Sequence, residues 1–355
     1  MSDLHPAQGV LGPIPLEGLG VTSMHEHLVV RMPQYLPPAR GDDADLPDAA
    51  IDLGTVGRIR RDPLCNHGNL LIDDVDGAIE EVAAFADAGG HTVVDVTNGD
   101  FGRDPHALVR AARATGLQFV MGAGHYIAAA HPPDMDARTV EGLAAEIVAD
   151  VTVGVGDTGV RAGIIGEVGC SGAITPNERK ALRAAALAQF ETGAPVSVHQ
   201  PIPFESRALE VLDVLEDAGA DLTHVLICHM DHTLADRGYH KAVADRGCML
   251  EFDRFGSEWY YDSRRQWWEW QDEDRAEAIR WLVASGHGDQ VVVGQDICYR
   301  INWLRHGGPG FGHLLQRVVP LLERVGIDDA AVRRILVDNP RRFLAFRRPL
   351  AAAAR

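Results

Sequence analysis

The stretch His91–Gly124 decides the fold class, and it reads HTVVDVTNGDFGRDPHALVRAARATGLQFVMGAG. It opens with a short apolar, β-branched run at 91–96, continues with helical spacing over 104–115 and closes with another apolar run at 119–124. Gly116 stands where the helix must stop. A strand, a helix and a strand in this order are typical of a parallel βαβ unit. Continuous apolar runs also indicate strands that are buried on both faces, as in a parallel sheet.

The same alternation extends along most of the chain. Strand-like apolar runs are predicted at 21–28, 91–96, 119–124, 163–167, 195–199, 225–229, 249–253 and 291–296. Helices are predicted at 73–88, 104–115, 139–153, 176–192, 205–217, 234–246 and 272–285, and again from 312 onward. Eight such units favour a (β/α)₈ TIM barrel over an open doubly wound sheet. We therefore predict one α/β barrel domain over residues 1–355.

Composition excludes several classes of partner. The formal net charge is −18, and no basic block stands out beyond short pairs near the C-terminus, which argues against nucleic acid or an anionic membrane as a partner. The five cysteines are scattered without C-x-x-C spacing, which favours reduced thiols in a cytoplasmic protein. The first residues lack a signal-peptide pattern, and no apolar stretch is long enough to span a bilayer. We expect a cytoplasmic protein that acts on a small molecule.

Two long segments depart from the alternation. Residues 31–70 are rich in Pro, Asp and Arg without clear periodicity, so we predict a long insertion after the first strand. Residues 297–312 (ICYRINWLRHGGPGFG) form an extended loop after the eighth strand. Because loops at this end cover the mouth of a barrel, Arg300 and Trp303 are predicted to contact the substrate, with Arg300 facing a carboxylate or phosphate.

A third segment is unusually aromatic. Residues 259–270 (WYYDSRRQWWEW) follow the seventh strand and contain four tryptophans and two tyrosines. Trp259 and Trp267 are predicted to wall an apolar substrate pocket at the mouth of the barrel. A subunit interface or core packing is an equally weighted interpretation of the same rings.

Side chains that bind metals close five of the predicted strands. The first strand ends with His25 and His27, whose spacing places both imidazoles on one face of a strand. Four later strands end with Glu167, His199, His229 and Asp296. In a (β/α)₈ barrel these ends meet at one face, where active sites lie. One such ending is an ordinary loop start, but five together predict a metal centre.

Six ligands exceed what one tetrahedral catalytic metal with an open position uses. They suit two divalent ions bridged by a carboxylate, an arrangement that generates a nucleophile at neutral pH. We expect Zn²⁺, with Mn²⁺, Co²⁺ or Fe²⁺ as alternatives for such ligands. A metal-binding ligand receptor on the same barrel would have lost some of these residues. A redox enzyme would favour an open facial triad on one iron. The pattern therefore predicts a two-metal hydrolase.

The ligand order resembles that of the phosphotriesterase-like family of the amidohydrolase superfamily. The similarity runs through nearly the whole chain and rests on MHEH, DVTNGDFGRDP, MGAGHYI, GIIGEVG, TPNERKALRAAALAQFETGAPVSVH, HVLICHMD, EFDRFG, VVVGQD and DNPRRF. Many members bridge their metals with a carboxylated lysine. Glu167 stands at that position here, as in the branch related to the phosphotriesterase homology protein. The resemblance also implies a homodimer.

The resemblance distributes the ligands over two sites. It implies that His25, His27 and Asp296 hold the more buried metal. It implies that His199 and His229 hold the more exposed one, with Glu167 bridging the two.

Further positions of the resemblance concern the reaction. Asp296 would collect a proton and pass it on, and His232 replaces the aspartate that continues this relay in phosphotriesterases. Tyr126 and the pair Asp253–Arg254 match residues of the family's lactonases, so Tyr126 and Arg254 are predicted to position the substrate. The resemblance thus implies lactone hydrolysis. Hydrolysis of N-acyl amides, or of a phosphotriester, is the alternative for the same site.

Overall fold

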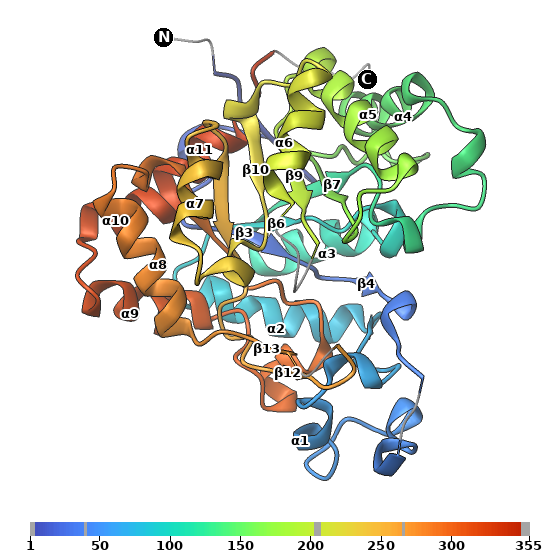
Figure 1. Ribbon diagram of the computed structural model, residues 1–355, viewed down its shortest axis with the longest axis vertical. Helices are drawn as coiled ribbons and strands as arrows, with labels where there is room; N and C mark the ends of the chain where they lie inside the picture. The colour runs from blue at the N-terminus through green and yellow to red at the C-terminus, as the bar shows by residue number, and fades with distance from the viewer. Residues whose placement is uncertain (1–3, 39–40, 202–206, 265–266, 349–355) are drawn as a thin grey trace.

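Figure 1 shows the computed structural model, which describes residues 4–38, 41–201, 207–264 and 267–348. Its centre is a sheet of eight strands, and every strand pair in the sheet for which a register is given is parallel. In chain order these are β3 (Thr22–Glu26), β6 (Thr92–Asp95), β7 (Gln118–Ala123), β8 (Ile164–Gly169), β9 (Val196–His199), β10 (Val225–Ile227), β11 (Met249–Phe252) and β14 (Val291–Val293). The backbone N–H of Asp296 donates to the carbonyl of His25 at 3.0 Å, which joins the two ends of the sheet. The predicted barrel is confirmed.

Helices pack around the barrel (Figure 1). They are α2 (Val75–Asp87), α3 (Pro105–Thr115), α4 (Val140–Thr152), α5 (Pro176–Thr192), α6 (Ala208–Asp217), α7 (Arg237–Ala244), α8 (Asp272–Ala284), α9 (Val319–Arg324), α10 (Asp329–Arg333) and α11 (Asn339–Leu344). The predicted start of the sixth helix at 205 lies outside the described residues. Within the described ranges, no helix combines the length and the apolar character that crossing a membrane requires.

Local sequence signals explain where these helices begin and end. Thr175 caps α5 by accepting a hydrogen bond from the N–H of Glu178, and the Glu178 side chain accepts from the N–H of Thr175 in return. Gly193 ends the helix in the left-handed region, at φ 71°. These signals fix where the chain turns back into β9, and therefore where the end of that strand lies.

The insertion at 31–70 is folded, which periodicity did not predict. It lies between β4 (Val30–Arg31) and β5 (Leu71–Ile72), which pair antiparallel, and contains the short helix α1 (Val56–Ile59). Its apolar side chains, including Met32, Leu46 and Leu64, are buried in the main core. The insertion consists mainly of short 3₁₀ turns, which leave no 3.6-residue pattern in the sequence. A second unpredicted element is the hairpin of β1 (Ala7–Gly9) and β2 (Gly12–Ile14).

The aromatic segment after the seventh strand packs against this insertion. It forms a hairpin of β12 (Tyr260–Tyr261) and β13 (Trp267–Trp268), drawn in orange beside the blue α1 region in Figure 1. The N–H groups of Tyr260 and Asp262 donate to the carbonyls of Arg60 and Arg61, each at 3.2 Å. Segments 200 residues apart in the chain therefore build one wall beside the barrel mouth.

One buried histidine makes the stability of the fold depend on pH. His224 is fully buried, and its Nε2 donates to the carbonyl of Phe343 in α11 at 2.7 Å. Burial, assisted by Arg347, lowers the pKa of His224 to about 4. An unfolded histidine titrates near pH 6.5, so between these values the unfolded chain binds more protons than the native one. The contribution of His224 is therefore fully present above about pH 6.5 and is lost as the pH falls toward 4.

We expect His224→Gln to reduce the loss of unfolding free energy between pH 7.5 and 4.5 by about 2 to 3 kcal/mol. Urea unfolding at the two pH values measures it. His106→Gln is the control, because His106 is exposed at the start of α3. An unchanged pH dependence in the His224 variant would contradict the prediction.

Candidate metal centre

The histidines of the first strand face two carboxylates at the carboxyl ends of the barrel strands. His25 Nε2 lies 3.7 Å from Glu167 Oε2 and 3.9 Å from Asp296 Oδ1. His27 Nε2 lies 3.2 Å from Asp296 Oδ1 and 3.7 Å from Glu167 Oε1. All four side chains are buried. The His-x-His pair thus directs both imidazoles to one point, as the strand periodicity predicted.

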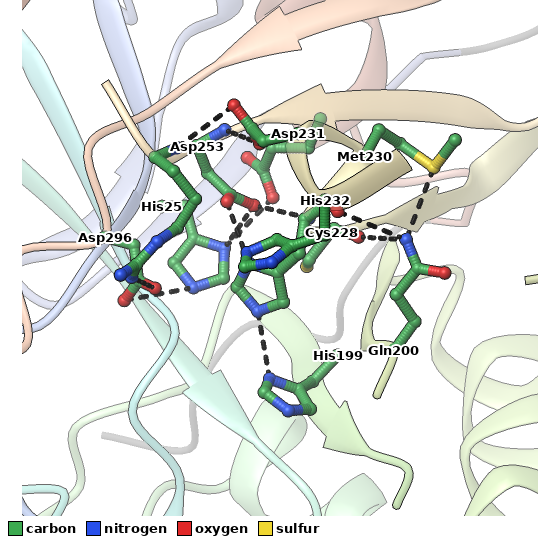
Figure 2. Close-up of polar contacts among 12 residues, drawn as sticks. His25, His199, Gln200, Cys228, Met230, Asp231, His232, Asp253 and Asp296 are labelled. Atoms are coloured by element: carbon green, nitrogen blue, oxygen red, sulfur yellow. Dashed lines mark hydrogen bonds and ion pairs between the residues drawn. The ribbon is translucent and has the colours of Figure 1, made fainter. Parts of the chain in front are cut away.

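The other two histidines also lie close to the Glu167 carboxylate. His199 Nδ1 lies 3.1 Å from Glu167 Oε2, and His229 Nε2 lies 3.5 Å from that oxygen. The two imidazoles are themselves 2.9 Å apart, between His229 Nε2 and His199 Nδ1 (Figure 2). Glu167 therefore stands between two histidine pairs, which is the position that a bridging ligand needs.

In three of the four predicted histidine ligands, the ring nitrogen Nδ1, which does not face Glu167, has a hydrogen-bond partner. The partners are Thr97 Oγ1 for His27 at 2.8 Å, Glu251 Oε2 for His25 at 3.0 Å and Asp253 Oδ1 for His229 at 2.8 Å. Such partners fix the tautomer and the ring orientation of metal-binding histidines and raise their basicity. Sequence analysis did not assign a role to Thr97 or Glu251. Thr97 lies just beyond β6, which pairs with β3, and Glu251 lies on β11, next to β14 in the sheet.

Backbone geometry distinguishes two of the converging residues. His229 and Asp296 have φ values of 58° and 48°, and they are the non-glycine residues with positive φ in the described part of the chain. Each such conformation costs about 1–3 kcal/mol. Hydrogen bonds hold both in place, from the His229 N–H to Asp253 Oδ2 at 2.8 Å and from the Asp296 N–H to the His25 carbonyl at 3.0 Å. The fold thus maintains strain where the ligands converge.

The two carboxylates of the centre carry the negative charge that a bound cation needs. Burial alone would raise the pKa of Glu167, but the imidazoles of His199 and His25 hold that pKa well below its usual value. Burial likewise opposes ionisation of Asp296, and Arg254 and His27 keep the Asp296 pKa well below normal. Both carboxylates are therefore anionic at neutral pH.

The predicted ligand atoms are also spaced as the ligands of a metal ion are. His25 Nε2 is buried without a hydrogen-bond partner among the described residues, although two carboxylate oxygens face it at 3.7 and 3.9 Å. Those separations are too long for hydrogen bonds. Ligands that each lie about 2 Å from one ion are about 3–4 Å from each other. His25, His27 and Asp296 also form one compact group of potential ligand atoms, and His25, Glu167 and His229 form another.

A cavity of about 180 Å³ opens beside these residues. His27, Glu167 and Asp296 line its inner end, and apolar side chains such as Met32, Leu64 and Trp267 line its wall. The apolar part comes from the insertion and from the hairpin of β12 and β13. Both segments therefore contribute to the site, as expected for Trp267.

Tyr126 lines the cavity beside His199. Its hydroxyl is 3.3 Å from His199 Nδ1, and its ring stacks on Phe101 with centroids 4.2 Å apart. The hydroxyl of Tyr35 donates to the hydroxyl of Tyr126 at 3.0 Å. Tyr35 belongs to the insertion and lines the same cavity, and sequence analysis missed it because it lies in a segment without periodicity.

Arg254 lies in the cavity wall, and its guanidinium forms hydrogen bonds to three neighbouring side chains. It contacts the Asp296 carboxylate through Nη1, the Tyr261 hydroxyl through Nη2 at 3.0 Å and Glu269 through Nε at 3.2 Å. The arginine predicted to position the substrate is thus paired with a predicted metal ligand. Its charge is directed at Asp296.

His232 lines the cavity without a hydrogen bond. Neither ring nitrogen has a hydrogen-bond partner among the residues described, although Nε2 lies 4.0 Å from Glu269 Oε1. The ring stacks on Trp267 with centroids 4.9 Å apart. Its pKa lies well below the usual value because of burial and the nearby charge of Arg254. His232 is therefore a neutral imidazole at neutral pH, and its ring centroid lies 6.0 Å from that of His229.

Three predicted substrate contacts are not among the described residues that line the cavity. Trp259 is buried, and the guanidinium carbon of Arg60 lies 5.2 Å from the centre of its ring. Arg300 donates to the Leu71 carbonyl and to Asp73, each at 2.7 Å. Trp303 is 1% exposed. The loop after the eighth strand folds back onto β5, where Arg300 is bound, and Trp303 is buried outside the described cavity lining.

Comparisons with known proteins agree with this geometry. The model of the Phosphotriesterase family matches residues 5–344. An N-acetyltaurine hydrolase of Salmo salar is 36% identical over 343 residues, covering 96% of this chain and 98% of its own. A resiniferatoxin-binding protein from Rhodobacter sphaeroides superimposes with a TM-score of 0.94 at 38% identity, over 97% of each chain. A lactonase from Listeria monocytogenes superimposes with a TM-score of 0.78 at 28% identity, over 96% of this chain and 99% of its own.

The family match extends over nearly all of the chain, and the hydrolase relative covers almost its full length. The family is one of binuclear metal-dependent enzymes, and the cluster of His, Asp and Glu side chains described above fits that chemistry. This chain belongs to the phosphotriesterase family, and it is a metal-dependent hydrolase.

Proposed function

We propose that this enzyme hydrolyses the amide bond of N-acyl amino compounds. The observation that carries the proposal is His232, a neutral imidazole in the cavity wall whose two nitrogens lack hydrogen-bond partners among the described residues. Full-length similarity to N-acetyltaurine hydrolases, at 36% identity for the relative from Salmo salar, supports the same substrate class. Amide hydrolysis therefore replaces lactone hydrolysis, the first expectation from sequence, as the leading function.

We propose that the six ligands predicted from the strand ends hold two divalent ions, in first place Zn²⁺. His25, His27 and Asp296, which form one compact group, would hold one ion. His199 and His229, whose facing ring nitrogens are 2.9 Å apart, would hold the other. Glu167 would contact both. When bound, the ions would supply an activated water molecule and a Lewis acid for the acyl carbonyl.

The protein's own groups would orient the substrate and move the proton. Asp296 Oδ1, next to His27, accepts the proton released by the attacking water and delivers it to the leaving nitrogen. Arg254 keeps Asp296 anionic between turnovers. The Tyr126 hydroxyl donates to the acyl oxygen. The apolar wall of the cavity excludes water from the acyl group.

His232 is the group that distinguishes an amide from an ester. A neutral imidazole has one nitrogen that accepts and one that donates a hydrogen bond. An amide substrate presents an N–H that an ester lacks, so only the amide satisfies the accepting nitrogen of His232. A site built around such a bond favours the substrate that completes it.

Lactone hydrolysis is the second candidate, and the observation in its favour is Tyr126. This tyrosine matches the lactonases of the family, and its hydroxyl lies 3.3 Å from His199 Nδ1. The lactonase from Listeria monocytogenes shares the fold along the full chain at 28% identity. The same ligands and the same proton acceptor would serve ring opening.

A substrate panel separates the candidates. Metal-loaded and chelator-stripped enzyme would be assayed for proton release and amine release on N-acetyl amino compounds, γ- and δ-lactones and one phosphotriester. We expect metal-dependent turnover that is fastest on the N-acetyl compounds. His232→Phe, which keeps a ring against Trp267, should lower kcat/KM for the amides about tenfold and leave lactone turnover nearly unchanged. Metal-dependent turnover confined to lactones would overturn the proposal.

A further inference from the structure

We propose that Arg264 binds an anionic group at the far end of the substrate, so that the enzyme selects N-acyl amino acids or N-acyl aminosulfonates over uncharged amides. This inference rests on the proposed amide hydrolysis. It adds a specificity residue at the outer rim of the cavity, away from the metal ligands. It also assigns a role to the aromatic segment after the seventh strand.

The first argument is the distribution of charge in the cavity. Two arginines line it, Arg254 and Arg264. Arg254 is buried, and its guanidinium is bonded to Asp296, Glu269 and Tyr261. Arg264 is exposed, and no carboxylate of the described residues is found in an ion pair with it. Its charge is therefore available to a ligand, and that of Arg254 is not.

The second argument is the position of Arg264 relative to the metal centre. Its guanidinium carbon lies 5.9 Å from the centre of the Tyr35 ring, within the range of a cation–π contact. The Tyr35 hydroxyl bonds to Tyr126 at 3.0 Å, and the Tyr126 hydroxyl lies 3.3 Å from His199 Nδ1. One continuous wall thus connects the outer cation to the inner ligands. A substrate lying along this wall has its acyl carbonyl at one end and its second functional group at the other.

The third argument concerns the charges that an anionic substrate would meet in the cavity if Arg264 were absent. The acidic side chains in its lining are Glu167 and Asp296, and the formal net charge of the chain is −18. The net charge of the chain disfavours the approach of an anionic substrate from solvent, while bound metal ions would offset only the two carboxylates at the centre. The Arg264 guanidinium supplies a positive charge away from that centre, and its fork of N–H donors matches the oxygens of a carboxylate or sulfonate. Uncharged lactones and phosphotriesters have no group that uses it.

The test compares charged and uncharged amides on the metal-loaded enzyme. The substrates are N-acetyltaurine and N-acetyl-β-alanine, with N-acetylpropylamine as an uncharged amide of similar length. We expect Arg264→Gln to lower kcat/KM about tenfold to a hundredfold for both anionic substrates, mainly through KM, and to leave the uncharged amide within about twofold. Arg264→Lys should retain part of the preference. Arg110→Gln, an exposed arginine on α3, is the matched control and should change nothing.

Two further measurements sharpen the test. Ethanesulfonate should inhibit the wild type competitively and inhibit Arg264→Gln at least about tenfold more weakly. The selectivity for anions should also decrease with added salt, because Arg264 is exposed. Comparing kcat/KM for N-acetyltaurine with kcat/KM for N-acetyl-β-alanine shows whether the enzyme prefers a sulfonate or a carboxylate.

The outcomes separate this inference from the proposed function. Equal losses on the charged and uncharged amides, or none on either, would overturn the role of Arg264 and leave amide hydrolysis standing. Absence of turnover on every amide by the metal-loaded wild type would overturn the proposed function itself.

Discussion

The variant Glu167→Gln is expected to lose both metals and at least about a thousandfold in kcat/KM. Among the residues that the structure describes, Glu167 is the one carboxylate within 4 Å of all four predicted histidine ligands. Glutamine keeps the shape of the side chain and removes its negative charge, so neither histidine pair keeps an anionic partner at this position. A ligand that served one metal only would leave the other in place. The expected double loss is therefore specific to a bridging position.

Metal content per chain, measured by elemental analysis after dialysis against a weak chelator, tests this expectation together with the assay. Glu80→Gln is the control, since Glu80 is exposed on α2. Unchanged urea unfolding of the metal-free variant would show that the fold survives. Retention of one tightly bound metal would assign Glu167 to a single site, and retention of both with full activity would remove it from the centre.

The ligands could be predicted from the sequence because strand periodicity and barrel topology act on every residue in the same way. His25 and His27 are two residues apart in the predicted strand, so their side chains are expected to share a face, and in the structure His27 lies one residue beyond the end of β3. Glu167, His199 and Asp296 stand at or just beyond the ends of runs that a parallel barrel brings to one face. No loop conformation enters the argument, and the distances of 3.1 to 3.9 Å around Glu167 and Asp296 agree with it.

The pocket wall could not be predicted in the same way, because loop residues obey no period. Arg300 and Trp303 were expected over the mouth, but the loop folds onto β5 and Arg300 pairs with Asp73. Tyr35, from a segment with no helical or strand pattern, lies in the cavity instead. Loop direction is decided by contacts between segments far apart in the chain, such as that between Tyr260 and Arg60.

Arg275→Met is expected to lower the free energy of unfolding by about 3–5 kcal/mol, the usual cost of breaking a buried ion pair. Arg275 is fully buried in α8, and it donates to Asp231 Oδ1 at 3.0 Å and to Glu269 Oε2 at 3.2 Å. Methionine fills similar space but leaves the buried carboxylate of Asp231 without its arginine, whereas Glu269 keeps Arg254 as a partner. Burial and the facing Asp253 already raise the pKa of Asp231.

The pH dependence identifies the cause of this loss. Without Arg275 the pKa of Asp231 should rise further, so the native state binds more protons than the unfolded chain, and its stability falls as the pH rises. The difference from wild type should therefore be larger at pH 8 than at pH 5 in urea unfolding. Arg280→Met is the control, because Arg280 lies exposed on the same helix and pairs with Glu277. A loss that does not vary with pH would indicate a packing defect.

The substitution Arg275→Met should also affect the metal centre. Asp231 accepts hydrogen bonds from the N–H of Asp253 at 2.9 Å and of Arg254 at 3.4 Å. Asp253 in turn holds both the N–H and Nδ1 of His229, which keeps a left-handed backbone conformation. Arg275 thus supports His229 through two carboxylates without touching the cavity lining. We expect Arg275→Met to weaken metal affinity as well as stability, whereas a purely structural role elsewhere in the barrel would leave metal affinity unchanged in the folded fraction.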